Sequence, residues 1–105
     1  MITHTMLVSF ADPIPDEELE RFVSDIEKAM ADTGVVRRFH AQRHIAVDGE
    51  QAIPAFIATA VLQFEVSSEA DLATLFAAPG ASPVIHTWQA RRPYRVAWVN
   101  HETSA

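Results

Sequence analysis

The sequence predicts a single α+β domain over residues 1–105, with four strands and two helical regions in the order β-α-β-β-α-β. Three observations support this prediction. Short runs of β-branched and aromatic residues alternate with amphipathic stretches of helical period. Clusters of Pro, Gly and Asp separate these runs, as turns do. No linker or low-complexity segment divides the chain, whose 105 residues correspond to about one domain.

Residues 3–10 predict the first strand, because the run is short, β-branched and apolar and is ended by the turn sequence ADPIP. Residues 15–34 predict a helix. Pro15 suits its first turn, acidic residues follow where the helix dipole favours anions, and Gly34 is a typical C-terminal stop. The buried face of this helix is expected to carry the apolar stripe Leu19, Phe22, Val23, Ile26 and Met30.

Residues 35–47 and 55–66 predict the second and third strands, joined by a turn over residues 48–54. In the second strand, the alternation places one set on the apolar face: Phe39, Ala41, Arg43, Ile45 and Val47. The opposite face is polar: Arg38, His40, Gln42 and His44. The third strand is the most apolar, and one of its faces carries Phe56, Ala58, Ala60, Leu62 and Phe64.

The second half of the chain predicts two short helices. Ser68 and Asp71 resemble a capping box, which opens a helix through Ala77. A further helix is expected over residues 83–91, with Ser82 as its cap and a proline in its first turn.

Residues 94–100 predict the last strand, and residues 102–105 are expected to form a loose tail. The element order matches the ferredoxin-like plan, an antiparallel four-stranded sheet with its helices on one face. Two short helical regions cannot cover the other face, which includes Ile57, Thr59 and Val61. We therefore expect a homodimer in which two sheets pack face to face.

Composition excludes several classes of function. The formal net charge is −6, whereas nucleic-acid binding favours basic surfaces. The chain has no cysteine, which excludes disulfides, zinc fingers and thiol nucleophiles. No apolar run is long enough for a membrane span, and the start MITHTMLVSF lacks the features of a signal peptide. The expected location is therefore the cytoplasm.

The stretch VVRRFHAQRHIAV concentrates histidine and arginine in an otherwise acidic chain. On a helix, His40 and His44 would have metal-ligand spacing, but on a strand they lie roughly 13 Å apart. A metal ion needs ligands at about 2 Å, so the two cannot share one ion, and no bound metal is expected. Two interpretations stay open: a solvated or dimer-facing polar surface, or a site at Arg38, His40 and His44 for an anionic or aromatic ligand.

A ligand pocket is predicted between sheet and helices. On the first strand, His4 shares its face with Met6 and Val8, and on the third, Ala58 and Ala60 are small where a filled core favours larger residues. The expected lining is Met6, Val8, Phe22, Ile26, Ala58, Ala60, Leu62 and Trp88. A neutral imidazole here is a candidate general base, so His4 is either catalytic or a hydrogen-bonded residue at a strand end.

The segment HTWQARRPY is the second polar and aromatic cluster. His86 and Tyr94 are candidate catalytic partners of His4, and Trp88 is a candidate pocket wall. Arg91 and Arg92 suit the negative end of a helix. No glycine-rich phosphate loop, Ser/His/Asp pattern or paired-carboxylate motif is present.

Four segments together resemble the dimeric α/β-barrel superfamily, nearest its stress-responsive A/B-barrel (Dabb) group: MITHTMLVSF, FHAQRHIAV, ATAVLQFEVSSEADLATLFAAP and YRVAWVN. The resemblance implies a ferredoxin-like protomer that dimerises through its sheet, with a ligand between sheet and helices. A first-strand histidine of the family's cyclases matches His4. The family's HPxH motif, however, is replaced by APGA at residues 78–81, which puts that particular cyclisation in doubt. Size and plan also resemble the RedY-like proteins of prodiginine and bisindole pathways, HapK among them.

The resemblance implies a small cofactor-independent enzyme or accessory protein of secondary metabolism. Such a protein would cyclise, condense or isomerise an aromatic or polyketide-like intermediate, for example of prodiginine, pyrrole or indole type. Three alternatives remain: a non-catalytic binding or stress-response protein that uses the same pocket, a cofactor-free monooxygenase, and a haem-degrading relative. No single histidine stands out as the axial ligand that haem would need.

Overall fold

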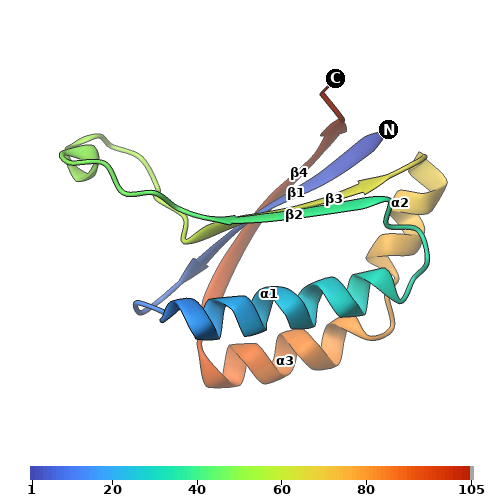
Figure 1. The fold of residues 1–105 in the computed structure, drawn as a ribbon, viewed down its shortest axis with the longest axis horizontal. Coiled ribbons are helices and arrows are strands. Elements are labelled where there is room, and N and C mark those ends of the chain that lie inside the picture. Colours follow the sequence, from blue (N-terminus) through green and yellow to red (C-terminus); the bar gives the residue numbers. More distant parts are fainter. Residues whose placement is uncertain (105) are drawn as a thin grey trace.

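The structure, a computed structural model, describes residues 1–104 and has the predicted β-α-β-β-α-β order (Figure 1). Its elements are β1 (Ile2–Phe10), α1 (Asp16–Ala31), β2 (Arg38–Arg43), the short helical turn η1 (Glu50–Ala52), β3 (Ala60–Val66), α2 (Glu69–Phe76), α3 (Ala81–Arg91) and β4 (Tyr94–Glu102). Among these residues, no helix is both long and apolar enough to cross a bilayer.

The four strands form one antiparallel sheet in the order β2-β3-β1-β4. Helices α1 and α3 lie side by side across one face, and within residues 1–104 no helix covers the other face, which we call the open face (Figure 1). The core fills the space between sheet and helices. Its largest fully buried side chains are Phe22, Phe64, Ile26, Leu62, Leu75, Val8 and Val66. The ferredoxin-like plan predicted from the sequence is confirmed.

Local signals account for the helix ends that were predicted well. The first turn of α1 carries three acidic residues, and Gly34 takes a left-handed φ of 77° shortly after the helix ends. At the start of α2, the backbone N–H of Asp71 donates to the Ser68 hydroxyl at 3.2 Å, as the predicted cap requires. The cap predicted at Ser82 is wrong, because α3 begins at Ala81 with Gly80 before it.

The second and third strands are shorter than predicted. The last hydrogen bonds at their ends run from His44 N–H to Thr59 C=O, at 2.8 Å, and from Thr59 N–H to the Val8 carbonyl, at 2.8 Å. Strand β1 pairs with β3 only as far as Val8 and ends at Phe10, so most of residues 45–58 have no third strand beside them. They form a projecting arm that contains η1 (Figure 1). Alternating apolar residues predicted a strand here, but pairing beyond the edge of a sheet lacks support.

The prediction of a loose tail over residues 102–105 began the tail too early. Strand β4 continues through Glu102, and the N–H of Thr103 donates to the Met1 carbonyl at 3.0 Å. The hydroxyls of Thr3 and Thr103 lie 2.6 Å apart. Residue 105 lies outside the described residues.

Candidate functional site

The histidine of the first strand is buried and held in one orientation. His4 is only 4% exposed and faces the helices between Phe64 of β3 and Asn100 of β4. Its Nδ1 lies 2.7 Å from Oδ1 of Asn100. Because an amide oxygen can only accept, Nδ1 must carry the proton of the neutral ring. Nε2 has no hydrogen-bond partner within residues 1–104, so its lone pair is free to accept a proton.

Burial favours this neutral form. It lowers the pKa of His4 below the usual value, and the hydrogen bond to Asn100 opposes that shift more weakly. Aromatic rings surround the imidazole, with centroids 4.9 Å away for Phe76, 5.8 Å for Trp98 and 6.3 Å for Phe64. His4 is therefore a neutral base at pH 7 in an apolar, aromatic environment.

His4 lines a cavity of about 170 Å³ between the sheet and all three helices. Its other walls include Met6 of β1, Met30 of α1, Leu75 of α2 and Ile85 of α3. The lining contains no charged side chain apart from a protonated His4. An apolar cavity of about 150 Å³ is large enough for benzene, so this one has room for one small ring.

Three exposed apolar side chains form the mouth of this cavity. Phe76 is 49% exposed, Ile85 is 38% exposed and Trp98 is 58% exposed. The rings of Phe76 and Trp98 meet nearly edge to face at 5.7 Å. A ligand larger than one ring would extend across this apolar rim.

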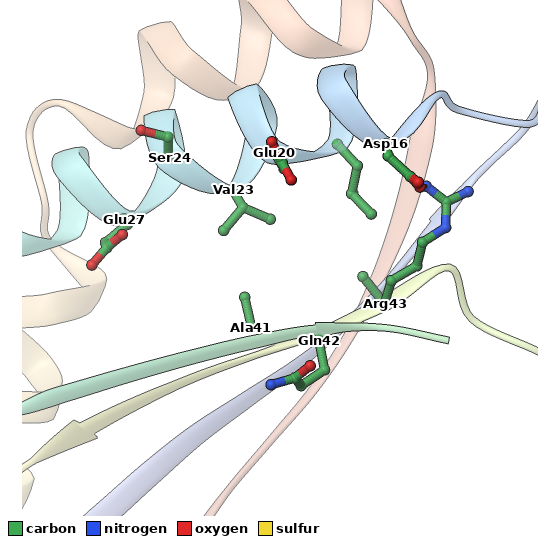
Figure 2. Close-up of a pocket in the computed structure, with 10 residues that line it drawn as sticks. Asp16, Glu20, Val23, Ser24, Glu27, Ala41, Gln42 and Arg43 are labelled. Carbon is green, nitrogen blue, oxygen red and sulfur yellow. The ribbon is translucent and has the colours of Figure 1, made fainter. Parts of the chain in front are cut away.

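A larger cleft of about 490 Å³ lies between α1 and the β2 edge of the sheet (Figure 2). Small side chains open it, because Ala41 and Ala60 form part of its floor. Its volume falls within the range of about 300–1,000 Å³ that ligand pockets occupy. Glu20 and Glu27 of α1 line it from the helix side (Figure 2).

The one cation in the lining of this cleft is already engaged. Arg43 donates to a carboxylate oxygen of Asp16 at 2.8 Å and to the carbonyl oxygen of Ile14 at 2.9 Å. The cleft therefore combines an apolar floor with exposed carboxylates, and it lacks an oriented, desolvated base such as His4. Of the two cavities, the His4 cavity is the better equipped for proton transfer.

The two predicted catalytic partners of His4 lie elsewhere. Tyr94 is buried in the core against Phe10 and Phe22, and burial raises the pKa of its hydroxyl. Tyr94 precedes Asn100 by six residues on β4, which corresponds to roughly 20 Å along a strand. His86 is exposed on α3 and does not line the His4 cavity.

Most of the predicted pocket wall is core instead. Val8, Phe22, Ile26 and Leu62 are at most 2% exposed and line none of the cavities described above. Trp88 is also buried, and its indole N–H donates to Asp25 at 2.9 Å. Met6 alone of this set lines the cavity with His4.

The two small alanines open different spaces. Ala60 is on the floor of the α1 cleft, and Ala58 lines a groove on the open face at the base of the arm. Leu62 and Phe64 fill the space on β3 between Ala60 and His4. The structure therefore does not bring His4 and Ala60 into one pocket.

The polar face of β2 does not gather into an anion site. Nε2 of His40 lies 3.4 Å from Glu65, and Nε2 of His44 lies 3.0 Å from Glu50, so both imidazoles face carboxylates. Arg38 is exposed beside them. Within residues 1–104, no group of three or more acidic, His or Cys side chains could hold a metal ion.

The sequence interpretation missed Asn100, Met30 and the aromatic rim as parts of the site. Alternation along β4 was a usable signal, since it places Val96, Trp98 and Asn100 on the face that also carries Tyr94. Which of them lies opposite His4 depends on the pairing of β1 with β4, and one strand alone does not show it.

Comparisons with known proteins agree with this architecture. No family model and no curated protein matches the sequence. Among solved structures, a Dabb family protein with a ferredoxin-like fold from Mesorhizobium loti has a TM-score of 0.72 and 15% identity, covering 99% of this chain and 97% of that chain. The chain therefore shares the ferredoxin-like fold of these structures.

Two further structures show how diverse the proteins with this fold are. HapK from Hahella chejuensis has a TM-score of 0.69 and 15% identity, and the match covers 99% of this chain and 93% of HapK. Hydroxynitrile lyase from Passiflora edulis has a TM-score of 0.73 and 11% identity, covering 98% of this chain and 93% of the lyase. At these identities the shared feature is the fold.

Proposed function

We propose that the protein is a small cofactor-independent enzyme in which His4 is the general base. The supporting observation is the pair of His4 and Asn100: a buried imidazole, oriented through Nδ1, with Nε2 unpaired in an apolar cavity. A general base must be unprotonated at the operating pH, and the lowered pKa of buried His4 meets this condition.

The reaction we propose begins with proton transfer. Nε2 of His4 takes a proton from a weakly acidic C–H or O–H group of the ligand, which leaves the ligand as an anion and the ring as imidazolium. Asn100 Oδ1 stabilises the imidazolium by accepting from Nδ1–H. Return of the proton to a different atom of the ligand completes an isomerisation. In a cyclisation or condensation, the ligand carbanion forms a bond to a carbonyl carbon, the C=O π bond opens to an alkoxide, and the alkoxide takes the proton back from His4; a condensation then loses this oxygen as water. No electron acceptor is needed.

The cavity and its rim support the substrate class that we propose. An uncharged aromatic or polyketide-like molecule suits a space of about 170 Å³ with Phe76 and Trp98 at its mouth. We propose an intermediate of secondary metabolism, such as a prodiginine, pyrrole or indole precursor. The hydroxynitrile lyase shows that a protein with this fold can be an enzyme, and HapK carries the same fold.

We further propose that the protein acts as a cytoplasmic homodimer. The open face of the sheet exposes Leu7 and Val99, at 45% and 57%, with no helix to cover them. Apolar surface of this kind on a β-sheet favours association with another sheet.

The test is base-catalysed ring opening of nitrobenzisoxazole, a small aromatic probe. A base removes its C–H proton, the N–O bond breaks, and the phenolate formed is followed by absorbance. Loss of a general base typically costs about 10²–10⁴ in rate, so His4→Ala should lose that much. His44→Ala is the matched control, since His44 lies outside the cavity, and it should retain full activity.

The same variants separate an enzyme from a carrier. Quenching of Trp98 fluorescence reports binding at the cavity mouth. Binding of aromatic probes without any His4-dependent turnover, here or with pathway intermediates, would favour the non-catalytic binding protein. Equal rates in the wild type, His4→Ala and His44→Ala would refute the assignment of His4 as the base.

A further inference from the structure

The arm formed by residues 45–58 carries an unusual amount of exposed apolar surface. Ile45 is 83% exposed, Phe56 77%, Val47 65%, Ile53 63% and Ile57 38%. The arm projects from the ends of β2 and β3, away from the helices and beyond the body of the domain (Figure 1). A soluble monomer rarely exposes a contiguous apolar patch of more than a few hundred Å².

The arm cannot cover this surface with its own domain while its base keeps the observed geometry. At the base, His44 N–H donates to Thr59 C=O and Thr59 N–H donates to Val8 C=O, each at 2.8 Å. Beyond these bonds the arm extends outward from the ends of β2 and β3 (Figure 1). Phe56 and Ile57 at its base line a groove of their own domain, whereas the outer side chains Ile45, Val47 and Ile53 do not and need a surface from another molecule.

A suitable surface is present on every copy of this chain. Apart from Met1, the large apolar side chains that are exposed outside the arm occupy two places. Three surround the mouth of the His4 cavity, and the other two, Leu7 and Val99, lie on the open face. Beside Leu7 is a groove of about 340 Å³, also lined by Val61 and by Phe56 at the base of the arm.

Charge complements this apolar match. The arm contains Asp48 and Glu50 and no Lys or Arg. The open face carries Arg95 at the start of β4, and Arg95 makes no ion pair within residues 1–104. Docking on the open face would bring the acidic arm of one copy near Arg95 of the other, whereas contact between two arms would bring like charges together.

We propose that the arm is a dimer clasp, in which residues 45–58 of one copy dock on the open face of a second copy beside Leu7 and Val99. In a two-fold dimer each contact occurs twice, so both arms dock and both open faces are covered. The clasp rests on the homodimer proposed above and adds the segment that holds it together.

Cross-linking tests where the arm lies. The chain has no cysteine, so single cysteines can be introduced without background. Ala55→Cys places a thiol on the arm and Ala97→Cys places one on the open face, and both alanines are exposed. The two variants, one with a mass tag, are mixed, allowed to exchange subunits and treated with a short bismaleimide. We expect the mixed cross-link between Cys variants of different mass to dominate.

The other outcomes are distinct. If cross-links form only between two Ala97→Cys chains, or only between two Ala55→Cys chains, the protein is a dimer but the arm does not dock on the open face, and the clasp is refuted. A monomer mass for the wild type at micromolar concentration, with no cross-link, refutes the dimer itself and the clasp with it.

Measurement of the dimer dissociation constant provides a second, independent test. Phe56→Ser removes an apolar anchor twice per dimer and should raise the dimer dissociation constant by roughly 10²-fold to 10⁴-fold. Phe76→Ser is the matched control, since Phe76 is also exposed but lies at the cavity mouth. Both should keep the wild-type thermal melt at concentrations where each protein is monomeric. An unchanged dissociation constant for Phe56→Ser would contradict the clasp.

Discussion

Replacing Asn100 offers a direct test of how His4 is held. In Asn100→Leu the Nδ1–H of His4 loses its acceptor, which lies 2.7 Å away in the wild type. An unsatisfied buried donor costs about 1–3 kcal/mol. We expect the lower end, about 1 kcal/mol, because Asn100 itself is exposed and water can reach part of the vacated position. For a domain of this size, that corresponds to a melting temperature lower by roughly 4–8 °C.

The same substitution should move the pKa of His4 in a known direction. The hydrogen bond to Asn100 raises the pKa against the effect of burial, so its removal in Asn100→Leu should lower the pKa further. Asn100→Asp should have the opposite effect, because a carboxylate beside the ring favours the imidazolium. The pH at which a His4-dependent rate falls on the acid side should shift with this pKa. It should move to lower pH in Asn100→Leu and to higher pH in Asn100→Asp.

The assay is an NMR titration of the imidazole signals, with His4 assigned from the signal that disappears in His4→Ala. A double variant, His4→Phe with Asn100→Leu, replaces both partners by apolar groups and should recover much of the lost stability. Identical His4 pKa values in the wild type, Asn100→Leu and Asn100→Asp would show that the bond between Nδ1 and Oδ1 does not form, and would refute the orientation of the base derived above.

Three further predictions follow from the cavity and its surroundings. Burial holds the pKa of His4 below its unfolded value of about 6.5, so the stability from neutral His4 is complete above that pH and declines as the pH falls through the folded-state pKa. His4→Phe should therefore flatten this acid decline in urea unfolding, and an unchanged slope would contradict it. Trp98→Ala should weaken binding of aromatic probes by roughly tenfold, since one aromatic contact contributes about 0.5–1.5 kcal/mol, and equal affinity by calorimetry would exclude the rim from the site. Ala60→Leu should fill part of the α1 cleft and leave His4-dependent turnover unchanged, whereas a large loss of rate would place the ligand in the cleft.

Much of the fold was predictable because its signals are local. The caps and apolar stripe of α1, the Ser68 cap of α2 and the alternation of β1 depend on residues close in sequence. The same alternation correctly placed His4 and Met6 on the helix-facing side of the sheet. A period of two is a property of a single strand, so one segment is enough to show it.

Strand ends and strand neighbours were not predictable in this way. Residues 45–58 have the composition of strands, yet they form an arm, because β1 pairs with β3 only as far as Val8 and leaves most of this segment without a third strand. The sequence also suggested that Ala58 and Ala60 open the His4 pocket. In the structure Leu62 and Phe64 occupy that space, and the alanines open the groove and the cleft instead.

By itself, the sequence determined the order of the elements, the helix-facing position of His4 and the absence of cysteine chemistry. Only the tertiary structure decided the partners of His4. The pairing of β1 with β4 sets Asn100 opposite His4 and puts Tyr94 at the far end of the sheet. Residues 4 and 100 are joined through hydrogen bonds between strands at the two ends of the chain, and a shift of one residue would turn Asn100 to the open face. That register depends on the packing of the whole sheet, which no local pattern contains.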